Sequence, residues 1–146
     1  MAACMCMIQR WRGQPPTEAR FHESPEPRPL ASVCDLGGAE FPDVGVGDER
    51  RMRLELLRGK RIIAFVLGAP YIAIVAPKYP ALRSRHGPMC EPGTSNGPLH
   101  AIVLVSCSAS AYQYLDPYLP GAAQPLELTD DEFERCFAGY AAIFTR

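Results

Sequence analysis

The sequence lacks the features that mark membrane, secreted and nucleic-acid-binding proteins. The longest apolar run, residues 62–76, is interrupted by Gly68 and Pro70 and is shorter than the roughly 20 residues that a membrane-spanning helix needs. The first residues show no charged segment followed by an apolar segment and a cleavage site. With 15 basic and 16 acidic residues, the chain has no basic excess for binding phosphates. We therefore expect a cytoplasmic protein with neither a membrane nor a nucleic-acid partner.

The sequence also lacks the cysteine spacing of a metal or redox site. It contains six cysteines, but they are scattered and no C-x-x-C motif occurs. His86, Cys90 and His100 do not show the paired spacing of a zinc site. A chain of 146 residues can bury a core without disulfide bonds. Most of the cysteines are therefore interpreted as small buried apolar residues, and we expect no metal or organic cofactor.

The distribution of apolar residues, prolines and glycines predicts a single α+β domain over residues 1–146, with an antiparallel sheet. The predicted segments are an N-terminal helix in 1–13 ended by Gly13, an irregular proline-rich loop in 14–48, a helix and two buried strands in 49–76, a long loop in 77–98, and a hairpin, a helix and a terminal strand in 99–146. Within the last segment, Thr129 and Glu132 predict a capping box. Gly139 is expected to end that helix before a strand over 140–144.

Two ionisable residues bracket the predicted hairpin GPLHAIVLVSCSASAYQYLDP, which covers residues 97–117. If the turn lies at residues 108–111, residues whose numbers sum to about 216 lie opposite one another, and His100 meets Asp116 at the open end. An aspartate there can fix the tautomer of an imidazole, which is the base and orienter half of a nucleophilic triad. The alternative is structural, because histidines at strand ends and Asp-Pro turns are common.

Several segments, taken in order, resemble papain-like cysteine peptidases, and the bacterial branch related to bacteriocin leader peptidases is the closest in pattern. The second half of that family has a histidine at the start of an apolar strand, a strand ending in Asp-Pro, and an L-[ST]-x-x-E-F helix. The corresponding segments here are LHAIVLV (99–105), YLDP (114–117) and LTDDEF (128–133). In the first half, AACMCMIQRWRG (2–13) is similar to the family's helix, and LLRGKRIIAF (56–65) to its helix-glycine-strand step.

The resemblance implies a papain-like fold, with the N-terminal helix packed on an antiparallel sheet, and a hydrolase of peptide or amide bonds that acts on a peptide or protein substrate. It covers the chain apart from the loops 14–48 and 77–98. It implies that His100 is the general base and acid and that Asp116 orients it. No metal or organic cofactor is implied, and the oligomeric state stays open.

The resemblance puts the family's nucleophilic cysteine one position before Met1, and its oxyanion-hole glutamine further upstream. We therefore expect either a chain truncated just after the nucleophile or a pseudoenzyme, with weak or no activity as written. Cys4 lies within one turn of the predicted helix start, where a thiol pKa is lowered from about 8.5. It is the candidate substitute nucleophile, and the alternative is a core residue.

Two other classes of function stay open. The first is a catalytically dead peptide-binding or interaction module on the same fold, which holds an extended peptide in the cleft that the resemblance implies. The second is a redox or metal-responsive protein that uses Cys4 and Cys6. Tyr71, Tyr79 and Tyr118 are interpreted either as residues that line a cleft or as packing residues.

Overall fold

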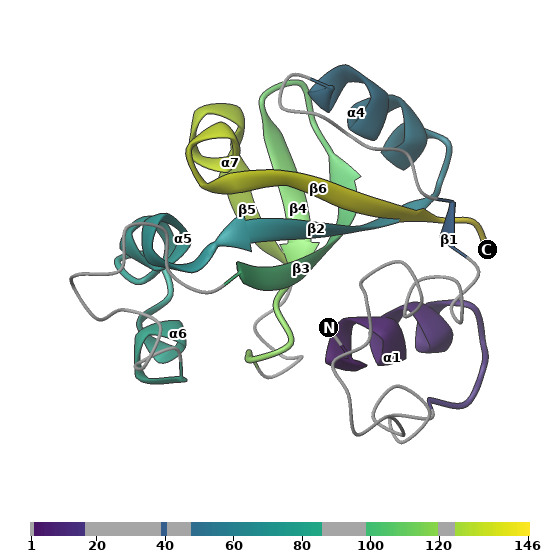
Figure 1. Cartoon of the computed structure of the whole chain (residues 1–146), viewed down its shortest axis with the longest axis horizontal. Helices are drawn as coiled ribbons and strands as arrows, with labels where there is room; N and C mark the ends of the chain where they lie inside the picture. The colour runs from purple at the N-terminus through teal and green to yellow at the C-terminus, as the bar shows by residue number, and fades with distance from the viewer. Residues whose placement is uncertain (1, 17–38, 41–47, 86–98, 120–124) are drawn as a thin grey trace.

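The computed structural model describes residues 2–16, 39–40, 48–85, 99–119 and 125–146 (Figure 1). The described helices are α1 (Ala2–Trp11), α4 (Glu49–Leu57), α5 (Gly68–Val75), α6 (Pro80–Arg85) and α7 (Asp130–Cys136). The described strands are β1 (Ala39–Glu40), β2 (Arg61–Leu67), β3 (Leu99–Cys107), β4 (Ala111–Leu115), β5 (Leu126–Thr129) and β6 (Phe137–Phe144). They form one antiparallel sheet in the order β1-β6-β2-β3-β4-β5. The predicted α+β class with an antiparallel sheet is confirmed.

The sheet carries a separate apolar core on each face. Along β2, Ile62, Ala64 and Val66 join the core that includes residues of α4, α5 and α7. Ile63 and Phe65 point the other way and join a smaller core with α1. This alternation is the two-residue period of a strand that is buried on both faces. In Figure 1, α1 accordingly lies on one side of the sheet, and α4 and α7 on the other.

Helix α1 forms and ends as its sequence predicts. Its buried side chains include Cys4, Met5 and Ile8, which contact the sheet. Gly13 follows the helix with a φ of 74°, in the left-handed region that glycine adopts at low cost. The Gly13 N–H donates to the carbonyl of Arg10, and the Gln14 N–H to that of Gln9. These two bonds make a Schellman motif, so the predicted glycine stop is confirmed.

The capping box of α7 is confirmed, whereas the predicted end of that helix is wrong. The Thr129 hydroxyl accepts from the Glu132 N–H, and the Glu132 carboxylate accepts from the Thr129 N–H. The helix ends at Cys136, and β6 begins at once with Phe137, three residues earlier than expected. Gly139 lies inside β6 with a φ of 84°, where the β2–β6 register shifts. The glycine therefore serves a β-bulge rather than a helix end.

Two further predictions between residues 68 and 98 are corrected. The second of the two strands expected within 49–76 is a helix, because Gly68–Val75 forms α5. Pro70 is tolerated in the first turn, where its missing N–H has no helical partner to lose. The predicted loop 77–98 contains the helix α6 (Pro80–Arg85), and its residues 86–98 lie outside the described part of the chain.

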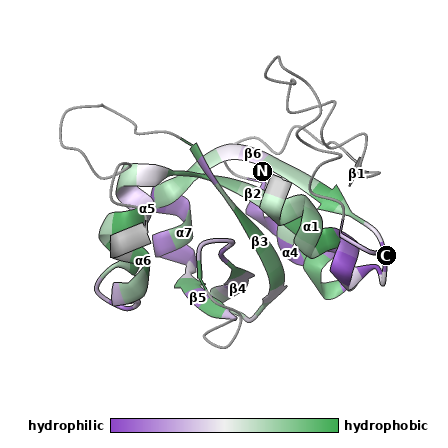
Figure 2. Cartoon of the chain, turned by 90° about the horizontal axis from the view of Figure 1, so that it is seen from below, coloured by the Kyte–Doolittle hydropathy of each residue, from purple (hydrophilic) through white to green (hydrophobic). Residues whose placement is uncertain are grey.

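Three other segments, at Asp48, β5 and 14–48, also differ from the sequence pattern or lie partly outside the described residues. Asp48 stands at the N-cap of α4, but its side chain makes no capping hydrogen bond. Strand β5 was not predicted. Most of the predicted irregular loop 14–48 lies outside the described residues, which include the short strand β1. Figure 2 shows the hydrophobic residues along β3 and the hydrophilic ones along much of α4, in line with their buried and outer positions.

None of the described helices combines the length and the apolar character that a membrane crossing requires.

Candidate active site

His100 and Asp116 lie together, as the hairpin predicts. The Nε2 atom of His100 is 3.0 Å from Oδ2 of Asp116. The Asp116 side chain is fully buried, and the His100 side chain is 5 % exposed. A histidine and a carboxylate in this geometry form a hydrogen bond that orients the ring and fixes which ring nitrogen faces the carboxylate. The structure therefore brings together the two residues that the sequence singles out.

The register that brings them together differs from the prediction by two positions. Val103, rather than Ala101, lies opposite Leu115, and the register shifts again between Leu104 and Ser106. His100 is therefore not directly opposite Asp116 in the ladder. Asp116 follows the last residue of β4, and its side chain reaches the imidazole from there.

Asp116 is held by two further donors. The Tyr71 hydroxyl donates to Oδ2 at 2.5 Å, and the Tyr118 backbone N–H donates to Oδ1 at 2.8 Å. The second bond, from the residue two positions on, is an Asx turn, which the Asp-Pro pair favours. The Tyr71 hydroxyl also lies 3.2 Å from the hydroxyl of Tyr114. Both oxygens of the carboxylate are therefore oriented by the protein.

Tyr71 is a permanent donor to this carboxylate. Burial raises the pKa of Tyr71 far above its ordinary value, and the neighbouring Tyr114 and Asp116 raise it further. Burial likewise raises the pKa of Tyr114. Both hydroxyls therefore stay protonated at neutral pH. The orientation of Asp116 does not depend on the titration of either tyrosine.

Two tyrosine rings fix the plane of the His100 imidazole. The Tyr71 ring centroid lies 5.3 Å from that of His100 with 33° between the planes, and the Tyr118 centroid lies 5.4 Å away with 24°. Tyr118 is about half exposed, with 46 % of its surface accessible. Because His100 stands opposite Val66 in the ladder, it shares the sheet face of the core that contains Tyr71. The ring is thus held between α5 and the turn after β4.

The structure places Cys4 beside the strand that carries His100. Its Sγ donates to the Ala101 carbonyl oxygen at 3.2 Å, and its side chain is fully buried. Burial raises the pKa of Cys4 to about 12, and the negative charge of Asp116 adds to the effect. The thiol is therefore held in its neutral, unreactive form. These observations favour the core interpretation of Cys4 over a substitute nucleophile, and Cys6 is also buried in that core.

The three tyrosines named from the sequence have different positions. Tyr71 and Tyr118 contact His100, whereas the Tyr79 hydroxyl accepts from the Glu127 N–H at 3.1 Å. Tyr114 was not identified in advance. The two-residue period of β4 could have indicated it, because it places Tyr114 on the same side of the chain as Asp116.

In the described part of the chain, no group of three or more histidine, cysteine, aspartate or glutamate side chains is arranged to hold a metal ion. Comparison with protein-family models, with curated protein sequences and with solved structures finds no match to this chain.

Proposed function

We propose that this chain is a papain-like hydrolase of the cysteine-peptidase type, directed at peptide or amide bonds, with weak or no activity as written because the nucleophile position precedes Met1. The observation that carries the proposal is the buried hydrogen bond of 3.0 Å between His100 and Asp116. The proposal is also supported by the order of the sequence motifs LHAIVLV, YLDP and LTDDEF, which contain and follow these two residues. A buried imidazole with an oriented carboxylate partner is the arrangement that activates a thiol nucleophile.

Each residue of the pair has a defined part in the reaction. Nε2 of His100 is bonded to Asp116, so Nδ1 is the atom assigned to proton transfer. His100 takes the thiol proton, the thiolate attacks the carbonyl carbon, and His100 returns the proton to the leaving amine. Water then hydrolyses the thioester with His100 as the base. Asp116 stabilises the imidazolium in each step, and Tyr71 is a positioning residue that holds Asp116.

The direction of α1 supports a nucleophile at the position that the family resemblance implies, immediately before Met1. Cys4 contacts Ala101, and Trp11 lies against Arg61, which bonds to the Val105 carbonyl. Helix α1 therefore runs along β3 in the same direction. A residue four positions before Cys4 would be rotated from it by only about 40° and displaced by about 6 Å. If the helix continued to that position, the residue would lie at the end of the sheet where β3 begins, on the face opposite to the one that His100 shares with Tyr71, so the thiol would have to reach the imidazole around that end of the sheet.

The test is a chain extended by Met-Cys directly before Met1, in a Cys4→Ala background. The alkylation rate of the added cysteine by iodoacetamide is followed by mass spectrometry as a function of pH. The expected midpoint lies well below the ordinary thiol pKa of about 8.5, because an imidazolium stabilises the thiolate. His100→Ala should return it to about 8.5.

A chain extended by Met-Ser is the matched control for background alkylation and for peptide hydrolysis. In the Met-Cys chain, hydrolysis of a mixed peptide library should appear and should be lost with His100→Ala and reduced with Asp116→Asn. An added thiol that titrates near 8.5 and does not respond to His100→Ala would contradict the proposed function.

The second candidate is a catalytically dead module that binds a peptide beside the His100–Asp116 pair. The neutral, buried thiol of Cys4 favours it, because this thiol is not in a nucleophilic state. A binding module should retain peptide affinity in the His100→Ala variant, measured by calorimetry, and should show no hydrolysis even in the Met-Cys chain.

A further inference from the structure

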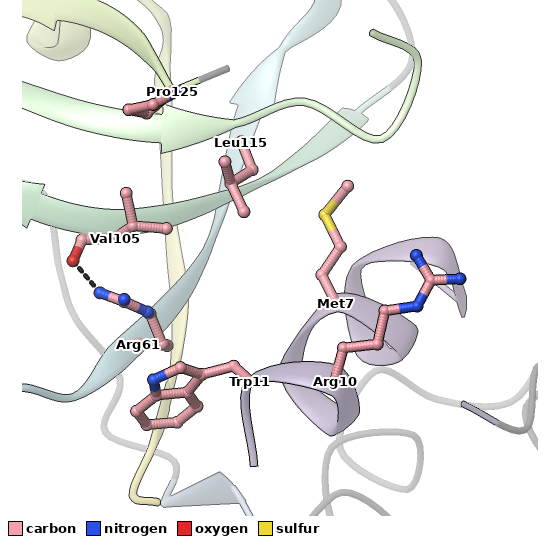
Figure 3. Close-up of a pocket in the computed structure, with 7 residues that line it drawn as sticks. All are labelled: Met7, Arg10, Trp11, Arg61, Val105, Leu115 and Pro125. Atoms are coloured by element: carbon pink, nitrogen blue, oxygen red, sulfur yellow. Dashed lines mark hydrogen bonds between the residues drawn. The ribbon is translucent and has the colours of Figure 1, made fainter. Parts of the chain in front are cut away.

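A pocket of about 500 Å³ lies beside α1, and neither His100 nor Asp116 lines it (Figure 3). Its volume is within the range of sites for small molecules, about 300–1,000 Å³. Most of its wall is apolar. The lining residues are Met7, Arg10 and Trp11 of α1, Arg61 of β2, Val105 of β3, Leu115 of β4 and Pro125.

Two guanidinium groups flank these apolar walls. Arg61 donates to the Val105 carbonyl oxygen, and its guanidinium carbon lies 5.3 Å from the centroid of the Trp11 ring. Figure 3 shows Arg61 on one side of the pocket and Arg10 on the opposite side, with Met7 between them. The pocket therefore offers an apolar interior with positive charge at two of its edges.

The charge around Arg61 is not balanced within the described structure. Burial lowers the pKa of Arg61, and the like charge of Arg146 lowers it further. Among the described residues, no carboxylate forms an ion pair with Arg61 or Arg10. An anion bound here would supply the missing opposite charge. A guanidinium already aligned by a carbonyl and an aromatic ring can bond to a carboxylate with little further loss of side-chain freedom.

We propose that this pocket binds a small apolar molecule that carries a carboxylate. The apolar body lies between Met7 and the sheet residues Val105 and Leu115, and the carboxylate bonds to Arg61. Arg10 contributes a second positive charge at the opposite edge. The proposal does not depend on the proposed function, because none of these residues takes part in the proton transfer assigned to His100.

Trp11 provides a direct assay, because it is the only tryptophan of the chain and lines the pocket. Decanoate is titrated into the full chain, and Trp11 emission is recorded. We expect a saturable change in emission and a rise in the melting temperature, because a ligand that binds only the folded state stabilises it. Decanol, which has the same tail without the charge, should bind about tenfold more weakly or worse.

The variants test the role assigned to the arginines. Arg61→Met should weaken decanoate binding by about tenfold or more, while Arg135→Met, at an exposed position on α7, should leave it unchanged. If Arg61→Met does not fold by circular dichroism, Arg10→Met at the exposed edge is used, and it should weaken binding by a smaller factor. Equal affinities for decanoate and decanol, unchanged affinity in both pocket variants, or no saturable binding would each overturn the proposal.

Discussion

Replacing Tyr71 by phenylalanine tests the hydrogen-bonded network behind His100. The substitution removes one oxygen and leaves the ring, so the contact with the imidazole is kept. It deletes the 2.5 Å bond to Asp116 and the 3.2 Å contact with the Tyr114 hydroxyl. A hydrogen bond to a charged group contributes about 1.5–3 kcal/mol, and Asp116 is fully buried. We therefore expect the free energy of unfolding to fall by about 2–3 kcal/mol.

The assay is urea denaturation followed by circular dichroism and by fluorescence, with coincident transitions as the test of two-state unfolding. Tyr112→Phe is the matched control. The Tyr112 hydroxyl donates to the neutral Glu49 carbonyl oxygen over 3.5 Å, so its loss should cost less than about 1 kcal/mol. If the two variants differ by less than about 0.5 kcal/mol, the carboxylate does not depend on Tyr71.

A structural role alone would not alter proton transfer. In the extended chain with the added cysteine, Tyr71→Phe should also raise the pH midpoint of iodoacetamide alkylation, because a less firmly oriented Asp116 stabilises the His100 imidazolium less well. A variant that loses stability but keeps the midpoint would show that Tyr71 supports the fold without positioning the pair.

Three further predictions concern other parts of the molecule. The pKa of Cys4 in the folded state is raised to about 12, whereas in the unfolded state it is about 8.5. The neutral thiol therefore contributes its full stability below about pH 8.5, and this contribution is lost as the pH rises towards 12. In Cys4→Ala, the free energy of unfolding should fall less steeply with pH over this range, by up to about 1.4 kcal/mol per pH unit. Glu132→Ala removes half of the capping box and should lower stability by about 1 kcal/mol, whereas Glu134→Ala on the same helix should change it by less than about 0.5 kcal/mol in urea titrations. Arg53→Met removes the partly buried ion pair with Asp130 and should lower the melting temperature by a few degrees. The same decrease in melting temperature should be measured in 0.5 M salt if the pair is shielded from solvent.

Features that depend on residues close together in the sequence were predicted correctly, whereas features that depend on distant residues were not. The end of α1 at Gly13 and the start of α7 at Thr129 depend on bonds within one helical turn, and both were predicted. The sequence of α5 also fits a strand. A short run of apolar residues shows neither the helical nor the strand periodicity when the element is buried on all sides. Strand β5 is four residues long, so its alternation is too brief to recognise.

The candidate site shows the same limit. His100 and Asp116 belong to one hairpin, so turn geometry alone places them near each other. Tyr71 comes from α5, 45 positions before Asp116, and reaches it only through the packing of α5 against the sheet. The order of strands decides that packing, and no local pattern in the sequence encodes it.

The shared core of α1 and β6 has a consequence for how the protein is made. Met5 and Ile8 near one end of the described chain pack with Phe144 near the other. Strand β6 lies inside the sheet, between β1 and β2, so the surface on which α1 rests is incomplete until β6 has been synthesised. The apolar side of α1 is therefore synthesised before the surface that covers it is complete. Until β6 has been synthesised, the apolar side of α1 stays exposed to chaperones and to aggregation.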